Sequence, residues 1–277
     1  MKLENKVAIV TGGGRGIGQG IVHCLAEEGA DVAVIDMNGE TASTVADEVR
    51  AMGRRSLAIQ ADVTDSGQVD RVVRETLNTL GKIDVLVNNV GGGGVPRHRT
   101  GAAPPRIARR FVDIDEDVWD STFELNVKTQ FLMCRAVVPH FMEQNSGKVV
   151  NIGSWLGHRP GNIQLFAYSV AKAAVLHFTR LLATELAVYN VNVNCVCPGD
   201  VLTPAIERAF EQRIQSSPEL AGKTPHDLFT ELIKPRTPLK RLQTPEDMGR
   251  AVVFLTSEDA RNITGHLFFV DGGQVMP

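Results

Sequence analysis

The sequence lacks most of the features that mark a secreted, membrane-spanning or nucleic-acid-binding protein. Its 277 residues include only four cysteines and no CxxC pair, which excludes the disulfide framework of a small secreted domain. A formal net charge of -3 provides no broad basic field for nucleic acid or an anionic membrane. No apolar run approaches the roughly 20 residues needed to cross a bilayer. With no secretion signal evident at its start, the chain is expected to be soluble and cytoplasmic, with reduced cysteines.

Seven short apolar runs, most of them β-branched, predict buried strands. Most are separated by segments of helical periodicity, and this alternation is typical of parallel strands joined by right-handed helical crossovers. The runs cover residues 7–10, 32–35, 56–60, 83–87, 148–152, 191–196 and 267–270. We therefore predict an α/β fold: a single doubly wound Rossmann-type domain over residues 1–277, with a seven-stranded parallel sheet flanked by helices.

Two stretches interrupt this alternation. Residues 91–112 are rich in Gly, Pro and Arg, whereas residues 203–240 have helical periodicity but follow no strand. Ligands of open α/β sheets bind beyond the carboxyl ends of the strands, where such excursions project. Both stretches are therefore expected to border the functional site.

A glycine-rich loop, residues 11–18 (TGGGRGIG), follows the first predicted strand and precedes a helix. Glycines allow the backbone to approach a pyrophosphate at the positive end of the helix dipole. The same cluster is also found in ordinary strand-to-helix turns, so its context between a strand and a helix carries the functional interpretation.

Asp36 ends the second predicted strand, about twenty residues after the glycine loop begins. A carboxylate there can accept hydrogen bonds from the adenosine ribose and would repel a 2′-phosphate. Arg15 argues in the other direction, because its cation could pair with that phosphate, although it could equally face water. The sequence therefore predicts NAD as the cofactor in preference to NADP.

Tyr168 and Lys172 stand four residues apart in a helical segment and so share one helix face. A lysine ammonium there would lower the tyrosine pKa from about 10, as proton transfer requires. Ser154 follows the strand at 148–152 and could hold a reacting oxygen. Taken singly, the Tyr-Lys pair could be an ordinary helix surface, and Ser154 could merely cap a turn.

In their order along the chain, these motifs resemble those of the classical short-chain dehydrogenase/reductase family, over essentially the full length. The matching residues are 11–18, Asp62-Val63, Asn88-Asn89-Val90-Gly91, Asn126, Ser154, Tyr168-x-x-x-Lys172 and Pro198-Gly199.

The resemblance implies a role for each catalytic residue. Tyr168 would exchange a proton with the substrate oxygen, and Ser154 would hydrogen-bond that oxygen. Lys172 would bind the nicotinamide ribose and keep Tyr168 acidic. Asn126 would hold, through its backbone carbonyl, a water that links Lys172 to solvent.

The resemblance also implies a set of cofactor-binding residues. Asp62 would accept from the adenine amino group with Val63 against the ring, Asn89 and Gly91 would line the adenosine side, and Thr203 would bond the carboxamide or phosphates. The complete set is Gly12, Arg15, Gly16, Ile17, Gly18, Asp36, Asp62, Val63, Asn89, Val90, Gly91, Tyr168, Lys172, Pro198, Gly199, Val201 and Thr203.

The chain departs from the family pattern at three places. Val90 replaces the usual alanine, and Ser154 lies fourteen residues before Tyr168, one more than usual. Residues 92–110 form an insertion of about a dozen residues. Its cations could bind an anionic substrate group, or could face solvent or another subunit; they are Arg97, His98, Arg99, Arg106, Arg109 and Arg110.

The segment between Ser154 and Tyr168 is expected to form one wall of the substrate pocket, with Trp155, His158 and Phe166 as candidates. The aromatic rings could equally pack into the core. The histidines are scattered without metal-ligand spacing, so no catalytic metal is expected. Residues 203–240 resemble the family's mobile substrate-binding helices, and a homotetramer is expected by analogy.

These observations predict an NAD(H)-dependent oxidoreductase that interconverts a secondary alcohol or diol and its ketone, with Tyr168 as general acid and base. The competing enzymatic interpretation is an NADPH-dependent carbonyl or 3-oxoacyl reductase, which Asp36 opposes. The competing interpretation of another class is a catalytically silent nucleotide-binding sensor or structural subunit. The residues at positions 126, 154, 168 and 172 argue against it.

Overall fold

The computed structural model describes residues 1–93, 110–161 and 163–276, which contain one seven-stranded parallel sheet. Its strand order is β3-β2-β1-β4-β5-β6-β7. The bounds are β1 (Val7–Thr11), β2 (Asp31–Asp36), β3 (Ser56–Gln60), β4 (Val85–Asn88), β5 (Gly147–Ile152), β6 (Val191–Pro198) and β7 (Leu267–Val270). The predicted sheet is confirmed, and the single-domain organisation of residues 1–277 stays a prediction.

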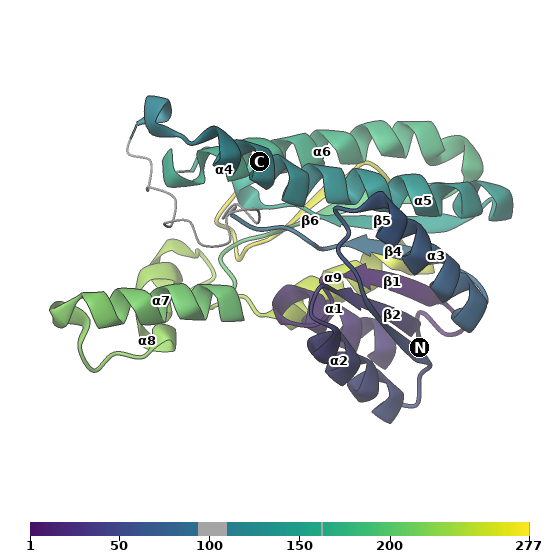
Figure 1. Cartoon of the computed structure of the whole chain (residues 1–277), viewed down its shortest axis with the longest axis horizontal. Helices are drawn as coiled ribbons and strands as arrows, with labels where there is room; N and C mark the ends of the chain where they lie inside the picture. The colour runs from purple at the N-terminus through teal and green to yellow at the C-terminus, as the bar shows by residue number, and fades with distance from the viewer. Residues whose placement is uncertain (94–109, 162, 277) are drawn as a thin grey trace.

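Helices cover both faces of the sheet (Figure 1). One side is packed by α1 (Gly16–Glu27), α2 (Gly39–Ala51) and α9 (Pro245–Thr256). The other is packed by α3 (Ser66–Leu80), α5 (Thr129–Gln144) and α6 (Phe166–Leu186). The strand order turns outward in both directions from β1 and β4, which places a crevice at the carboxyl ends of these two strands.

Alternation along β1 shows why its sequence is apolar throughout. Ala8 and Val10 belong to the core beneath α1 and α9, whereas Val7 and Ile9 belong to the core beneath α3 and α5. Successive side chains of a strand point to opposite faces, and a parallel sheet covered on both faces needs apolar residues on each.

Local capping signals set the helix ends, as in α3. The Asp65 side chain accepts a hydrogen bond from Gln68 N at the start of the helix. Gly81 ends it with φ of 90°, a left-handed conformation that glycine adopts without steric cost. The apolar residues of α3, among them Val69, Val72 and Val73, form the face that is buried against the sheet.

The second irregular stretch, residues 203–240, lies at the carboxyl side of the sheet. Residues 203–240 form two main helices, α7 (Pro204–Ser216) and α8 (Pro225–Ile233), which project from the body as a lobe (Figure 1). Leu228, Phe229 and Ile233 of α8 are buried, whereas α7 buries no residue. Most of the predicted insertion lies outside the described residues. Beyond it follow α4 (Glu116–Phe123) and a π-helical turn, η2 (Glu124–Lys128), that continues into α5.

One helical segment, Ile163–Tyr189, is long and apolar enough to cross a bilayer by length and composition, with a mean hydropathy of 1.2 over its most apolar window. The sequence has no uninterrupted apolar run of that length, because polar residues lie among the apolar ones of this segment. Within it, α6 buries Ala171, Lys172, Val175 and Thr179 against the sheet. This packing is that of an amphipathic helix with one face against the sheet.

Candidate active site

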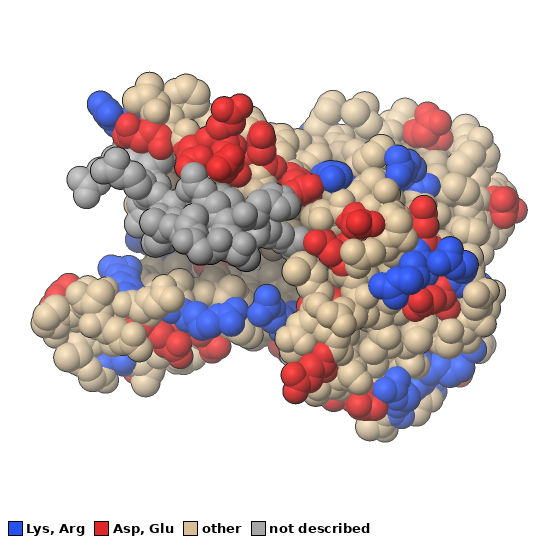
Figure 2. Space-filling view, viewed as in Figure 1, with Lys and Arg blue, Asp and Glu red and all other residues tan. Residues whose placement is uncertain are grey.

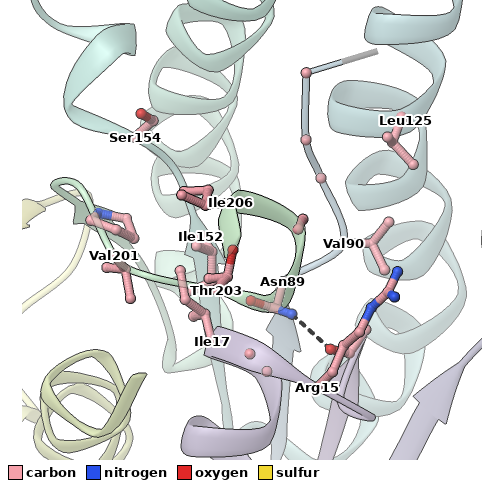
Figure 3. Close-up of a pocket in the computed structure, with 18 of the residues that line it drawn as sticks. Arg15, Ile17, Asn89, Val90, Leu125, Ile152, Ser154, Val201, Thr203 and Ile206 are labelled. Atoms are coloured by element: carbon pink, nitrogen blue, oxygen red, sulfur yellow. Dashed lines mark hydrogen bonds between the residues drawn. The ribbon is translucent and has the colours of Figure 1, made fainter. Parts of the chain in front are cut away.

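A pocket of about 930 Å³ opens at the carboxyl ends of the strands. Figure 3 shows Ile17, Ile152, Thr203 and Ile206 gathered on one side of it, with Leu125 on the other. The surface is hollowed beside the α7–α8 lobe (Figure 2). All the residues expected to bind the cofactor line this pocket.

The glycine loop leaves room for a ligand at the start of α1. Gly12 and Gly16 adopt positive φ values of 62° and 57°, which favour glycine. Asn89 Nδ2 donates to the carbonyl oxygens of Thr11 and Gly12, at 3.0 and 3.1 Å, and thereby fixes the loop against β4. Free N–H groups at the first turn of α1 face the pocket, as an anion requires.

Gly18 provides a test of this loop. A Cβ atom at this position would overlap the Gly12 carbonyl oxygen and lie 2.6 Å from Asn89 Nδ2. We expect Gly18→Ala to push α1 away from the loop, lower the free energy of unfolding by about 1–3 kcal/mol and weaken NADH binding. Thermal melts and NADH fluorescence titration measure both effects.

Gly67→Ala is the matched control, because a Cβ at Gly67 in α3 would meet only Asp65 Oδ1, at 3.3 Å. Unchanged NADH binding by Gly18→Ala would contradict the placement of the dinucleotide at this loop.

Asp36 is held rigidly beside the glycine loop. Its Oδ2 accepts from Gly14 N at 3.1 Å and its Oδ1 accepts from Asn38 N at 3.0 Å. Asp62 and Val63 line the same end of the pocket after β3, and Asp62 Oδ1 accepts from the Thr64 backbone and hydroxyl. The carboxylate of Asp36, which is expected to bind the ribose, is therefore held in place by the glycine loop and by the turn after β2.

The turn after β4 is tied to the π-helical turn η2 through Asn126, which is fully buried. Asn126 Nδ2 donates to Gly92 O at 2.9 Å, and its Oδ1 accepts from Gly92 N at 3.1 Å. A Cβ at Gly91 would lie 2.7 Å from Asn126 Oδ1 and 2.9 Å from Lys172 Nζ. Only glycine therefore fits where the chain passes the lysine. Asn126 itself does not appear in the pocket lining.

Ser154 and Tyr168 come together at the end of β5. Ser154 is buried, its Oγ accepts from Leu156 N at 3.2 Å, and it also hydrogen-bonds the Tyr168 hydroxyl. Both the turn-capping and the functional interpretations of Ser154 are thus consistent with its contacts. Burial raises the pKa of Tyr168, whereas its hydrogen bond with Ser154 lowers that pKa.

Lys172 lies one turn further along α6 and is buried, with its Nζ donating to Ile152 O at 2.8 Å. Burial lowers the pKa of this ammonium to about 8. Its Nζ is 5.7 Å from the centroid of the Tyr168 ring. Lys172 is not among the groups that shift the tyrosine pKa in the structure, where its Nζ donates to the Ile152 carbonyl. That Lys172 lowers this pKa stays a prediction.

The predicted substrate wall is only partly correct. Trp155 lines the pocket, but His158 and Phe166 do not. His158 packs edge-on against Phe269, with ring centroids 5.2 Å apart, and Phe166 packs against Trp119. The 3-10 turn η3 (Trp155–Gly157) lies between Ser154 and His158, and Phe166 begins α6.

Of the predicted cationic insertion, only Arg110 is among the described residues, where it pairs with Asp113 at 2.9 Å; Arg97, His98, Arg99, Arg106 and Arg109 lie outside them. Across the described chain, no group of three or more His, Cys, Asp or Glu residues could hold a metal. The absence of a catalytic metal stays a prediction.

Sequence reasoning missed several residues of the pocket. Leu125 and Ile206 supply apolar walls, and Asp200 supplies a carboxylate, next to the Pro198-Gly199 pair that the sequence did single out. Asp200 could have been found as an acidic residue directly after a strand that ends at the crevice. Leu125 carried no such signal, because its position depends on the π-helical turn.

The chain belongs to the short-chain dehydrogenase family, because the family model described as "short chain dehydrogenase" matches residues 6–214. It is 34% identical to an oxidoreductase UcpA of Salmonella typhimurium, over 100% of this chain and 97% of that protein. It is 35% identical to a cyclohexanol dehydrogenase of a Rhodococcus species, over 99% of this chain and 97% of the relative.

The fold agrees with solved structures of the family. A structure of 7 alpha-hydroxysteroid dehydrogenase in complex with NADH and 7-oxo glycochenodeoxycholic acid aligns with a TM-score of 0.82 and 31% sequence identity. The alignment covers 100% of this chain and 96% of that one. The sequence-based family assignment is therefore confirmed, and the chain is an oxidoreductase of this family.

Proposed function

We propose that the protein interconverts a secondary alcohol or diol and its ketone by hydride transfer with NAD(H). The observation that carries this proposal is the convergence of Ser154, Tyr168 and Lys172 at the end of β5, in the same pocket as the glycine loop and Asp36. The named activities of related proteins, cyclohexanol dehydrogenase among them, support an alcohol as substrate. The test is an assay of NADH formation with a panel of secondary alcohols, diols and hydroxy acids. Failure of the protein to oxidise every member of the panel would contradict the proposal.

The residues present fit a nicotinamide dinucleotide. The glycine loop offers free N–H groups to a pyrophosphate, and Asp36 offers an acceptor to a ribose hydroxyl. Lys172 lines the same pocket and would bind the ribose beside the reacting ring. When bound, the oxidised dinucleotide would accept the hydride and add a positive charge near the phenol.

The chain's own residues handle the proton. Tyr168 Oη takes it from the substrate hydroxyl during oxidation and returns it during reduction. Ser154 Oγ donates to the substrate oxygen and steadies its developing charge. Lys172 Nζ, now on Ile152 O, would turn towards the ribose and the phenol, and the carbonyl of Asn126 would hold a water that connects it to solvent. A π-helical turn at Asn126 accords with that role, since such turns are frequent at functional sites.

The preference for NAD rests on Asp36, whose fixed carboxylate would face a 2′-phosphate without an intervening cation. Arg15, the residue that could neutralise such a phosphate, is exposed and has no described ion pair. An NADPH-dependent carbonyl reductase is therefore the less favoured alternative.

The lysine pKa predicts a pH dependence of nucleotide binding. The Lys172 ammonium predominates below its pKa of about 8 and is lost as pH rises through that value. A charged hydrogen bond is worth about 1 kcal/mol more than a neutral one, so NADH affinity should fall roughly fivefold across this step. Fluorescence titrations at a series of pH values measure it, and Lys172→Met should bind more weakly without the step. An identical step in Lys172→Met would assign it to another group.

We also propose a cytoplasmic homotetramer. The four cysteines are buried and free, as a reducing compartment allows. Phe131 of α5 and Leu181 of α6 are exposed apolar residues on helices that cover the same face of the sheet, and contact with another subunit would bury them. Light scattering coupled to gel filtration tests the oligomeric state.

A further inference from the structure

The pocket contains one carboxylate that the proposed chemistry does not use, that of Asp200. Asp200 follows β6 directly after Pro198 and Gly199, and it lines the pocket together with Ser154 and Tyr168. Three acidic residues line the pocket among the described residues. Asp36 ends β2 and Asp62 follows β3, on the side of the sheet assigned to adenosine. Asp200 follows β6, which pairs with β5, the strand that precedes Ser154, so Asp200 belongs to the reacting half.

The carboxylate is clamped by Gln274 of the C-terminal tail. Gln274 Nε2 donates to Asp200 Oδ2 at 2.9 Å, and Asp200 N donates to Gln274 Oε1 at 3.2 Å. These two bonds fix the orientation of the glutamine amide, because its oxygen must face the backbone N–H. Gln274 does not line the pocket, so it holds Asp200 from the side away from the cavity.

The clamp occupies only one carboxylate oxygen. Over the described residues, no hydrogen bond reaches Asp200 Oδ1 and no ion pair forms with the carboxylate. Arg236 acts on it only at a distance, and burial raises the pKa of Asp200 while the Gln274 hydrogen bond lowers it. Asp200 lines the pocket, so its Oδ1 can be reached by a ligand. A ligand that displaces water from the pocket without offering a donor would leave this oxygen unsatisfied, which is costly, whereas a donor on the ligand would avoid that cost.

We propose that Asp200 is a specificity-determining residue that selects substrates with a second hydrogen-bond donor, a hydroxyl or an ammonium group, besides the reacting hydroxyl. This inference rests on the proposed alcohol oxidation. The surrounding wall is otherwise apolar, with Leu125, Leu156, Leu165 and Ile206, so a substrate without such a donor leaves the Asp200 oxygen unsatisfied.

A purely structural role for Asp200, as an anchor of the C-terminal tail, gives a different expectation. Loss of an anchor lowers stability and affects all substrates alike. Loss of a recognition group changes the ratio of kcat/KM between substrates with and without the second donor. Asp200→Asn separates the two roles, because Gln274 Nε2 still needs an acceptor and takes the amide oxygen. The amide nitrogen, a donor, then replaces Oδ1.

The experiment compares cyclohexanol, 1,2-cyclohexanediol and 2-aminocyclohexanol, which share one ring and one secondary alcohol, with NAD as oxidant. The wild type should favour at least one of the two substituted compounds by tenfold or more in kcat/KM, and Asp200→Asn should remove about that factor. The diol and amine arms identify which donor is recognised. The affinity of the favoured compound for the protein with bound NADH, measured by calorimetry, should also be lower in Asp200→Asn than in the wild type. NADH cannot oxidise the alcohol, so this measurement involves no turnover.

Asp70→Asn is the matched control, because Asp70 is exposed on α3 and does not line the pocket. Equal rates with all three compounds, or an unchanged ratio in Asp200→Asn, would overturn this inference and leave the proposed oxidoreductase intact. If the protein oxidises neither these compounds nor any other alcohol, both the proposed function and this inference are overturned.

Discussion

Replacing Tyr168 by phenylalanine should lower kcat by about 10²–10⁴-fold, the usual contribution of a positioned general acid or base. The change removes one hydroxyl and keeps the ring, so α6 and its packing are retained. NADH binding should be nearly unchanged, because Lys172 and the glycine loop, which would bind the ribose and the pyrophosphate, are left intact. Steady-state kinetic assays measure kcat, and NADH titrations on the same preparation measure cofactor binding.

Tyr189→Phe is an unusually close control. The chain has only two tyrosines, and Tyr189 ends the 3-10 turn after α6, packed against the core and away from the pocket. The same loss of a hydroxyl there should leave kcat unchanged. Substantial activity in Tyr168→Phe would show that another group moves the proton.

Replacing Asp36 by alanine should exchange the cofactor preference. Loss of a charged hydrogen bond to the ribose costs about 1.5–3 kcal/mol, which raises the KM for NAD about 10- to 150-fold. Removal of the carboxylate also removes its repulsion of a 2′-phosphate, so the KM for NADP should fall. The ratio of kcat/KM for the two cofactors measures the change.

Because Asp36 also accepts from Gly14 N and Asn38 N, alanine could disturb the loop as well as the charge. Asp36→Asn retains one acceptor and loses the charge, so it should relax the preference with less effect on stability. Asp70→Ala on α3 controls for a general change in charge. A wild type that favours NADP, or variants whose preference is unchanged, would assign cofactor selection elsewhere.

The fold could be predicted well because short apolar runs typical of strands alternate with segments of helical periodicity along most of the chain. Residues 7–10 and 191–196 are apolar without interruption, as strands buried on both faces must be, and the structure places both in the sheet. The helical segment that contains Tyr168 and Lys172 was also predicted, and the structure places both residues in α6.

The candidate site could be predicted where a residue follows a strand directly. Asp36 and Ser154 were found in this way, because parallel strands bring their carboxyl ends to one edge, whereas Thr203 was found through the family resemblance. His158 and Phe166 do not line the pocket, because their rings pack against Phe269 and Trp119. Such contacts join residues far apart in the chain, so no sequence period reveals them.

The electrostatics were the least predictable part. The spacing of Tyr168 and Lys172 correctly placed both in α6 and in one pocket, but it gave no measure of burial. Burial raises the pKa of Tyr168 and lowers that of Lys172, and the Ile152 carbonyl takes the lysine hydrogen bond. These effects depend on tertiary packing.

The most direct test is a crystal structure of the protein with bound NADH. The nicotinamide ring should lie in the half of the pocket lined by Ser154 and Tyr168, with Lys172 Nζ turned from Ile152 O to the ribose hydroxyls. A dinucleotide bound elsewhere, or a Tyr168 hydroxyl out of hydrogen-bond reach of both Ser154 and a substrate oxygen at that ring, would contradict the account.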